Sequence, residues 1–165
     1  MLMFPEHLAQ AARDFLKAAQ DRKLLLATAE SCTGGLIAAC VCEIPGCSAT
    51  LERGFVTYSN EAKADMLGVP MTLIQSKGAV SAEVARAMAE GALAHSQADI
   101  AIAVTGIAGP DGGSAEKPVG LVHFSAARKG RPALHEEHRF GDIGRLNVQA
   151  KSVETAFRLL MRLLD

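Results

Sequence analysis

The sequence predicts an α/β protein: one three-layer α/β/α domain on a mixed, mostly parallel sheet of about five strands. Short apolar segments alternate with amphipathic ones along the first part of the chain, which is typical of βα units in a parallel sheet. Two later strand-like segments flank a tight Lys129-Gly130 turn, so at least one strand is antiparallel. The length of 165 residues suits a single domain, which we expect to span residues 1–165.

The first half of the chain contains the predicted βα units. Apolar side chains recur at helical spacing in its first segment, and Asn60 is a typical N-cap for its last helix. The elements expected here are, in chain order, a helix at 7–20, a strand at 24–29, a helix at 33–41, a strand at 51–58 and a helix at 61–67.

The second half contains the segment most typical of a central strand, residues 100–105, which is apolar throughout. Ser81 is expected to cap the helix before it, and Leu146 to begin the apolar face of the last helix. The other elements expected are a short helix between Pro70 and Gly78, a helix at 82–95, strands at 120–128 and 133–140, and a C-terminal helix at 146–164.

The composition excludes several classes of protein. Hydrophobic residues make up 49% and charged residues 21% of the chain, which is normal for a soluble globular domain. A net charge of −1, one Tyr and no Trp argue against a nucleic-acid surface. Charges among the first twenty residues exclude a secretory signal, and no window approaches the roughly 20 apolar residues of a membrane span. We expect a cytoplasmic protein without nucleic-acid or membrane partners.

The four cysteines do not have the paired spacing of a zinc site. They are Cys32, Cys40, Cys42 and Cys47. Free cysteines in such a chain are usually reduced and partly buried thiols. We therefore expect neither a metal site nor a cofactor.

The segment from Ala27 to Gly35 brings reactive groups to the junction of a predicted strand and a predicted helix. It contains Glu30, then three consecutive hydroxyl or thiol side chains, then two glycines. Ser31 is either an N-cap or a nucleophile, and Thr33 is an alternative cap. Backbone N–H groups at a helix start attract oxygens, so they would form an oxyanion site. The N–H groups concerned belong to Cys32, Thr33 and Gly34.

Polar clusters follow three of the predicted strands, at residues 30–35, 58–63 and 105–113. In open α/β sheets, ligands bind at the carboxyl ends of the strands. If these three strands are parallel, the clusters meet at one edge of the sheet. The sequence therefore predicts a small-molecule site there.

Lys63 is the best candidate for a base that would activate Ser31. It lies in the first turn of a predicted helix, close to Tyr58, and partial burial would lower the pKa of its amine. The alternative is an ordinary surface lysine. No G-x-S-x-G motif is present, so an α/β-hydrolase arrangement is not supported. A solvated edge strand explains the histidines of the predicted hairpin, which are His123, His135 and His138.

The glycine-rich loop at 106–120 is long for a connection without function. Its glycines would let several N–H groups converge on an anion, although it lacks the lysine and serine or threonine of a P-loop. A mobile connection is the alternative reading. Arg139 and Arg145 are candidate phosphate partners, and each alone is more often a surface residue.

Several long motifs resemble the CinA C-terminal domain family, and in the family's order. They are Thr28-Ala-Glu-Ser-Cys-Thr-Gly-Gly35, Gly54-Phe-Val-Thr-Tyr-Ser-Asn-Glu-Ala-Lys63, Gly78-Ala-Val-Ser81, and Thr105-Gly-Ile-Ala-Gly-Pro-Asp-Gly-Gly113 with Glu116-Lys-Pro-Val-Gly120. The resemblance covers nearly the whole chain. Members of this family are nicotinamide-nucleotide amidohydrolases, also called nicotinamide mononucleotide deamidases or PncC.

The resemblance implies hydrolysis of the carboxamide of nicotinamide mononucleotide to nicotinate mononucleotide and ammonia, in the recycling of NAD. It implies Ser31 as nucleophile and Lys63 as base, with Tyr58 and Thr105 nearby and without metal or cofactor. The substrate contacts expected are Glu30, Thr33, Gly34, Gly35, Asn60, Gly106, Gly109 and Arg145. Larger members carry an additional N-terminal nucleotide-processing domain, whose activity is not expected here.

Two other functions remain open at this point. One is an inactive nucleotide-binding protein of the same fold, acting as an adaptor in competence or DNA damage. The other is a hydrolase with the same chemistry on a different amide. A homo-oligomer is also expected, because the apolar C-terminal helix and the alanine-rich helix at 82–94 offer surfaces that a second copy would bury.

Overall fold

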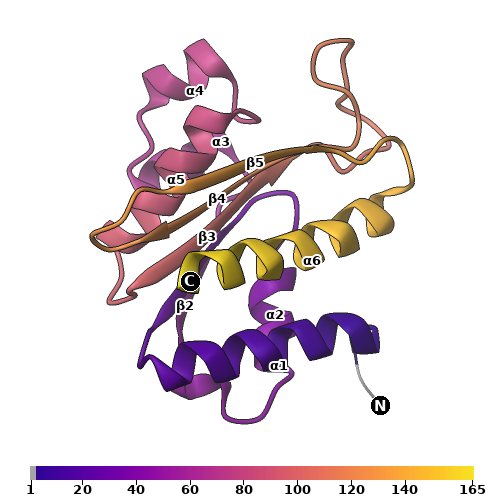
Figure 1. Cartoon of the computed structure of the whole chain (residues 1–165). Coiled ribbons are helices and arrows are strands. Elements are labelled where there is room, and N and C mark those ends of the chain that lie inside the picture. Colours follow the sequence, from indigo (N-terminus) through magenta and orange to yellow (C-terminus); the bar gives the residue numbers. More distant parts are fainter. Residues whose placement is uncertain (1–2) are drawn as a thin grey trace.

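The computed structural model describes residues 3–165, and within them helices cover both faces of a five-stranded sheet (Figure 1). The strands lie in the order β2-β1-β3-β4-β5. They are β1 (Leu26–Glu30), β2 (Leu51–Val56), β3 (Ile100–Gly106), β4 (Leu121–Arg128) and β5 (Leu134–Arg139). β1 is parallel to both β2 and β3, whereas β4 is antiparallel to β3 and β5. The predicted α/β/α class, with a mixed sheet and a C-terminal hairpin, is confirmed.

The helices form two layers, one on each face of the sheet (Figure 1). Helices α1 (Glu6–Asp21), α2 (Leu36–Cys42) and α6 (Arg145–Leu164) make the first layer, and α3 (Asn60–Leu67), α4 (Met71–Lys77) and α5 (Ala82–Ala94) make the second. A short 3₁₀ turn, Cys47–Ala49, precedes β2. No helix within residues 3–165 is long and apolar enough to span a bilayer.

The central strand β3 alternates in side-chain size rather than in polarity. Ile100 and Ile102 belong to the core under α1, α2 and α6, whereas Ala101 and Ala103 belong to the core under α3, α4 and α5. Successive strand residues point to opposite faces, so each face receives one size of side chain. Small residues also allow close packing within the second layer, where a Cβ on Gly91 would lie 2.0 Å from the carbonyl oxygen of Leu67.

Of the features expected at the starts of α3, α5 and α6, one agrees with the structure and two do not. The Ser81 hydroxyl accepts a hydrogen bond from the N–H of Val84, so the predicted cap of α5 is confirmed. The expected Asn60 cap is wrong, because Ser59 caps α3 and Asn60 is already helical. Leu146 does not begin a buried face: it is 79% exposed in the first turn of α6, beyond the helix residues that contact the core.

The interpretation of His123 as part of a solvated edge is also wrong. β4 is an inner strand, and His123 is 7% exposed with its Nδ1 3.0 Å from Nε2 of His135. Burial lowers the pKa of His123 below its ordinary value. His138 lies on the opposite face of β5, where its Nε2 is 2.6 Å from a carboxylate oxygen of Glu136.

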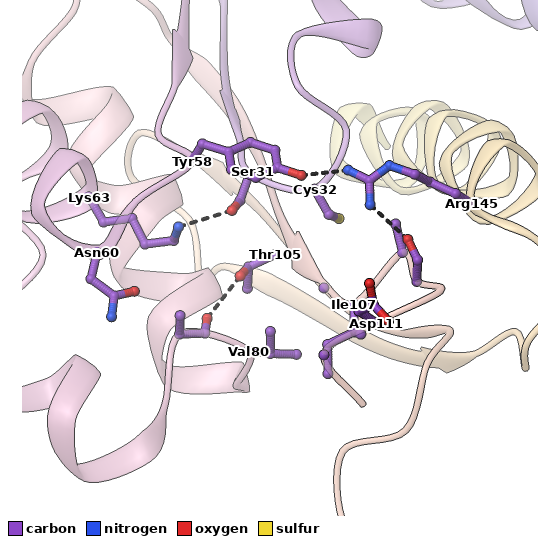
Figure 2. A pocket seen from close by; sticks show the side chains of 15 residues that line it. Ser31, Cys32, Tyr58, Asn60, Lys63, Val80, Thr105, Ile107, Asp111 and Arg145 are labelled. Atoms are coloured by element: carbon purple, nitrogen blue, oxygen red, sulfur yellow. Dashed lines mark hydrogen bonds between the residues drawn. The ribbon is translucent and has the colours of Figure 1, made fainter. Parts of the chain in front are cut away.

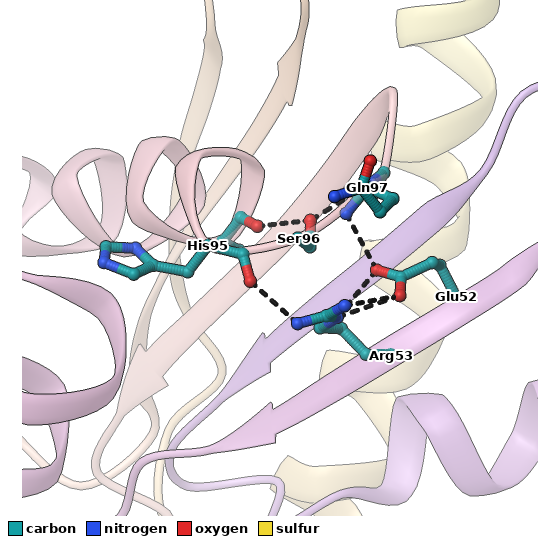
Figure 3. Close-up of polar contacts among 7 residues, drawn as sticks. Glu52, Arg53, His95, Ser96 and Gln97 are labelled. Atoms are coloured by element: carbon teal, nitrogen blue, oxygen red, sulfur yellow. Dashed lines mark hydrogen bonds and ion pairs between the residues drawn. The ribbon is translucent and has the colours of Figure 1, made fainter.

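The first residues of β2 are tied to the connection between α5 and β3 (Figure 3). Arg53 donates to the carbonyl oxygen of His95 at 2.9 Å, and the N–H of Gln97 donates to Glu52 at 3.1 Å. Glu52 and Arg53 also form an ion pair with each other. These bonds fix the start of β2, an edge strand, at the end of the sheet opposite to the polar clusters. The end of β2 is thereby positioned so that the residues after it, 58–63, lie among those clusters.

Candidate active site

A cavity of about 270 Å³ lies where β1, β2 and β3 end, and the predicted polar clusters meet there (Figure 2). All four residues proposed for the chemistry line it. They are Ser31, Tyr58, Lys63 and Thr105. Four of the expected substrate contacts line it as well, namely Asn60, Gly106, Gly109 and Arg145. The position that all of them except Arg145 share follows from the parallel core, because their segments leave β1, β2 and β3 at the same edge. Arg145 reaches the cavity from α6.

The innermost contact of the cavity joins Lys63 to Ser31. Nζ of Lys63 lies 2.9 Å from Oγ of Ser31, and it donates a second hydrogen bond to the carbonyl oxygen of Thr57 at 2.7 Å. Lys63 is 1% exposed and Ser31 8% exposed. A lysine held in this way cannot be the ordinary surface residue that was the alternative to a base.

Strand alternation explains why Ser31 faces Lys63. The N–H of Ser31 donates to the carbonyl oxygen of Val104, so the ladder with β3 continues one residue beyond β1. Successive side chains in an extended segment point to opposite faces. Glu30 therefore points toward α2, and Ser31 points toward α3, which carries Lys63. One position in the sequence separates a structural residue from a candidate nucleophile.

Glu30 takes the capping role that was assigned to Ser31 or Thr33. Its carboxylate accepts hydrogen bonds from the N–H groups of Ile37 and Ala38, at 2.9 and 3.1 Å, and from the Thr33 hydroxyl at 2.7 Å. A carboxylate at this position also suits the helix dipole. Both predicted caps of α2 are thus wrong, and the helix begins at Leu36 rather than at residue 33.

Four expected substrate contacts do not line the cavity. They are Glu30, Thr33, Gly34 and Gly35. Glu30 and Thr33 are hydrogen-bonded to each other within the cap of α2, and both are 1% exposed or less. The glycines have φ values of +58° and +100°, which turn the chain from β1 into α2. The N–H of Gly34 donates to the carbonyl oxygen of Ser31, so it is not free for an oxyanion, in contrast to the expectation.

Burial lowers the pKa of Lys63 below its ordinary value. Among residues 3–165 no carboxylate forms an ion pair with its amine. The neighbouring thiol of Cys32 does not offset this, because burial raises its pKa to about 12 and keeps it uncharged near neutral pH. Desolvation therefore favours the neutral amine, which is the form that can accept a proton.

Arg145 closes one side of the cavity from the first turn of α6 (Figure 2). Its guanidinium donates to the carbonyl oxygen of Gly109 at 2.8 Å and to the Tyr58 hydroxyl at 2.6 Å. On the next turn of α6, Gln149 donates to the carbonyl oxygen of Cys32 at 3.0 Å. The last helix thus touches all three polar clusters. Arg139, the other candidate phosphate partner, pairs with Glu137 outside the cavity.

The opposite wall is the segment before α5. The Thr105 hydroxyl donates to the carbonyl oxygen of Ala79 at 2.8 Å, and Lys117 of the glycine-rich loop donates to that of Lys77 at 2.7 Å. Gly78 has φ of +81°, and a Cβ there would lie 2.7 Å from Nζ of Lys117. These bonds hold Val80 against the cavity (Figure 2).

Sequence reasoning missed several residues that line the cavity. They are Ala79, Val80, Ile107, Ala108, Asp111 and Gly112. All of them lie in motifs that the sequence analysis had identified, so the segments were found and the individual side chains were not. No group of three or more His, Cys, Asp or Glu side chains in the described chain is arranged to hold a metal ion.

Comparison with known proteins identifies relatives over nearly the whole chain. The sequence model of the CinA C-terminal domain matches residues 8–164. A protein of Enterobacter agglomerans named nicotinamide-nucleotide amidohydrolase PncC is 52% identical over 133 residues, which cover 79% of this chain and 81% of that protein. A putative competence-damage inducible protein of Symbiobacterium thermophilum is 60% identical over 111 residues, covering 67% of this chain and 26% of the relative.

Another putative competence-damage inducible protein, from Caldicellulosiruptor bescii, is 47% identical over 142 residues, which cover 86% of this chain and 34% of the relative. The chain thus spans about a quarter to a third of these two longer relatives. Among solved structures, the competence/damage inducible protein CihA of Agrobacterium tumefaciens superposes with a TM-score of 0.99 at 50% identity, with both chains fully covered.

Proposed function

Because the chain belongs to the CinA C-terminal domain family, we propose that it is a nicotinamide-nucleotide amidohydrolase. Its reaction would convert nicotinamide mononucleotide and water to nicotinate mononucleotide and ammonia, in the recycling of NAD. The observation that carries this proposal is the 2.9 Å contact between Ser31 and a buried Lys63. The relative named PncC, which this chain matches over most of both lengths, supports the choice of substrate.

The first step uses the neutral form of Lys63. A neutral amine has one lone pair and two N–H groups. One N–H stays on the carbonyl oxygen of Thr57, which aims the lone pair at the hydroxyl of Ser31. The amine accepts the hydroxyl proton as Oγ attacks the carboxamide carbon, and Lys63 becomes an ammonium. Its burial makes this charge temporary, because desolvation favours returning the proton.

The second step returns that proton to the leaving nitrogen. The C–N bond of the tetrahedral intermediate breaks, ammonia leaves, and Ser31 carries the acyl group as an ester. Water then attacks the ester with Lys63 accepting its proton, and the released Oγ takes the proton back. The products are the carboxylic acid and free Ser31, and the acid then loses its proton to the released ammonia or to solvent, so atoms and protons balance over the cycle.

The negative oxygen of both tetrahedral intermediates needs a donor. Within residues 3–165 the backbone N–H of Cys32 donates to no other backbone group, and it belongs to the residue that follows the nucleophile. A preorganised donor of this kind contributes about 3 kcal/mol to a transition state. We assign this role to the Cys32 N–H, which is one of the three N–H groups that the sequence suggested; the Gly34 N–H is already bonded to the carbonyl oxygen of Ser31.

The remaining walls suit the other parts of the substrate. Arg145 keeps N–H groups beyond the two that it uses, and a guanidinium matches phosphate geometry. The Tyr58 ring, 58% exposed, offers a π-face to a cationic pyridinium. We propose that both contribute to substrate binding.

Release of ammonia from nicotinamide mononucleotide tests the proposal. The wild-type protein should produce ammonia and nicotinate mononucleotide in equal amounts, and Ser31→Ala should not. Nicotinamide and an unrelated linear amide belong in the same assay, because faster hydrolysis of either would favour a different amide as substrate. Wild-type protein that binds the nucleotide without releasing ammonia would instead support the inactive binding protein, and wild-type turnover by Ser31→Ala would refute the Ser31 mechanism.

A further inference from the structure

The cavity contains one carboxylate and two basic side chains, those of Asp111, Lys63 and Arg145. Lys63 lies at the bottom and is committed to Ser31 and Thr57. Asp111 comes from the glycine-rich loop and Arg145 from the first turn of α6. These two side chains of opposite charge therefore line the walls of the cavity. Figure 2 shows both side chains beside the cavity.

Within residues 3–165, neither of these two charges has a counter-ion from another side chain. The hydrogen bonds of Arg145 go to neutral acceptors, the carbonyl of Gly109 and the hydroxyl of Tyr58. No ion pair within residues 3–165 includes Asp111 or Arg145, whereas Lys77 with Glu83 and Arg139 with Glu137 are paired nearby.

Unpaired charges of opposite sign favour a ligand that carries both signs. A ligand cation beside Asp111 and a ligand anion beside Arg145 would each gain an ion pair, and no pair within the protein would have to break. A ligand of one sign would leave the other wall uncompensated. This preference for a ligand with both charges is electrostatic, so it should weaken as the salt concentration rises and screens the charges.

We propose that Asp111 determines specificity by selecting a ligand with a cationic ring, while Arg145 holds the anionic end of the same molecule. This inference rests on the proposed function for the identity of the ligand: nicotinamide mononucleotide combines a positively charged pyridinium with a phosphate. Glu30, the carboxylate among the substrate contacts that the resemblance implied, is excluded because it is fully buried and bonded to the start of α2.

The test compares two ligands that differ in ring charge and in the hydride that neutralises the ring. Nicotinamide mononucleotide has a cationic ring, and its dihydropyridine form has the same amide, ribose and phosphate with a neutral ring. Calorimetric titration of the Ser31→Ala protein measures both dissociation constants without turnover. We expect the cationic form to bind about five-fold more tightly at low salt, as for one partly exposed ion pair. Asp111→Asn in the same background should remove this preference by weakening the cationic form alone.

Asp142→Asn is the matched control, since it removes the same charge from an exposed residue that does not line the cavity. It should leave the preference unchanged. The inference is overturned if Ser31→Ala shows no preference, if Asp111→Asn weakens both forms equally or neither, or if neither form binds. A charge preference that depends on Asp111, together with wild-type protein that releases no ammonia, would refute the proposed reaction and leave this inference standing.

Discussion

Nζ of Lys63 and Oγ of Ser31 lie 2.9 Å apart in the interior, although 32 positions separate the two residues in the chain. The contact joins the end of β1 to the first turn of α3 across the edge of the sheet. Burial favours the uncharged form of the lysine, and the serine hydroxyl is its neighbour in the cavity. This geometry has consequences for activity and for stability that can be measured separately.

Ser31→Ala should lower kcat for ammonia release at least about 1,000-fold, because the nucleophile is removed and no neighbour replaces it. The melting temperature should stay close to that of the wild type, since the hydroxyl caps no helix. Ser76→Ala is the control, because it removes an exposed hydroxyl on α4 away from the cavity. Equal losses in both variants would contradict the assignment.

The pH dependence of kcat/KM should show an ascending limb from Lys63. The neutral amine is the base, so activity falls as the pH drops through the pKa of Lys63 and the amine is protonated. Burial lowers that pKa below the ordinary 10.5, so the limb lies below that value.

Lys63→Arg tests the same point, because a guanidinium stays protonated at every accessible pH and cannot accept the proton. Its kcat should fall by at least about 1,000-fold and should not recover at alkaline pH. A Lys63→Arg protein with the wild-type pH profile would show that another group is the base.

Glu30→Gln should lower the free energy of unfolding by about 2 kcal/mol, because a charged acceptor of one buried and one partly buried N–H group is replaced by a neutral amide with one oxygen. Urea denaturation measures this change. Glu61→Gln, on the exposed side of α3, is the matched control and should change it by less than about 0.5 kcal/mol. Wild-type stability in Glu30→Gln, with a raised KM, would favour the substrate contact that the sequence suggested.

The buried His123 should make the protein less stable in mild acid. Burial lowers its pKa below 6.5 in the folded state, although the nearby Glu137 opposes this shift. Below pH 6.5 the unfolded chain therefore binds more protons than the folded one, so the free energy of unfolding falls as the pH drops toward the lowered pKa.

Melting temperatures measured from pH 8 to pH 5 show whether this occurs. His123→Asn should make the dependence in that window shallower, since it removes one of two titrating groups; burial also lowers the pKa of the neighbouring His135, which remains in the variant. Losses that begin only below about pH 4.5 would belong to carboxylates such as Glu136, whose pKa is lowered by its His138 and arginine partners, and they should persist in the variant. An unchanged slope between pH 6.5 and pH 5 in His123→Asn would rule out this histidine as the cause.

The sequence by itself determined the elements and the edge at which the site forms. The apolar run at 100–105, the Lys129-Gly130 turn and the Ser81 cap are local signals, and hydrophobic patterning and turn chemistry act over a few residues whatever the rest of the chain does. The parallel core then follows from the βα order, and it brings the three polar clusters together.

Only the tertiary structure decided what each side chain within those clusters does. Alternation about β1 assigned the cap to Glu30 and released Ser31, and contacts with α3 buried Lys63. The exposure of Leu146 and the burial of His123 likewise depend on which helices and strands lie beside them in space. Such roles depend on contacts between residues that are far apart in the chain, and a shift of one position changes the partner. Local sequence patterns do not indicate which distant residue the partner is.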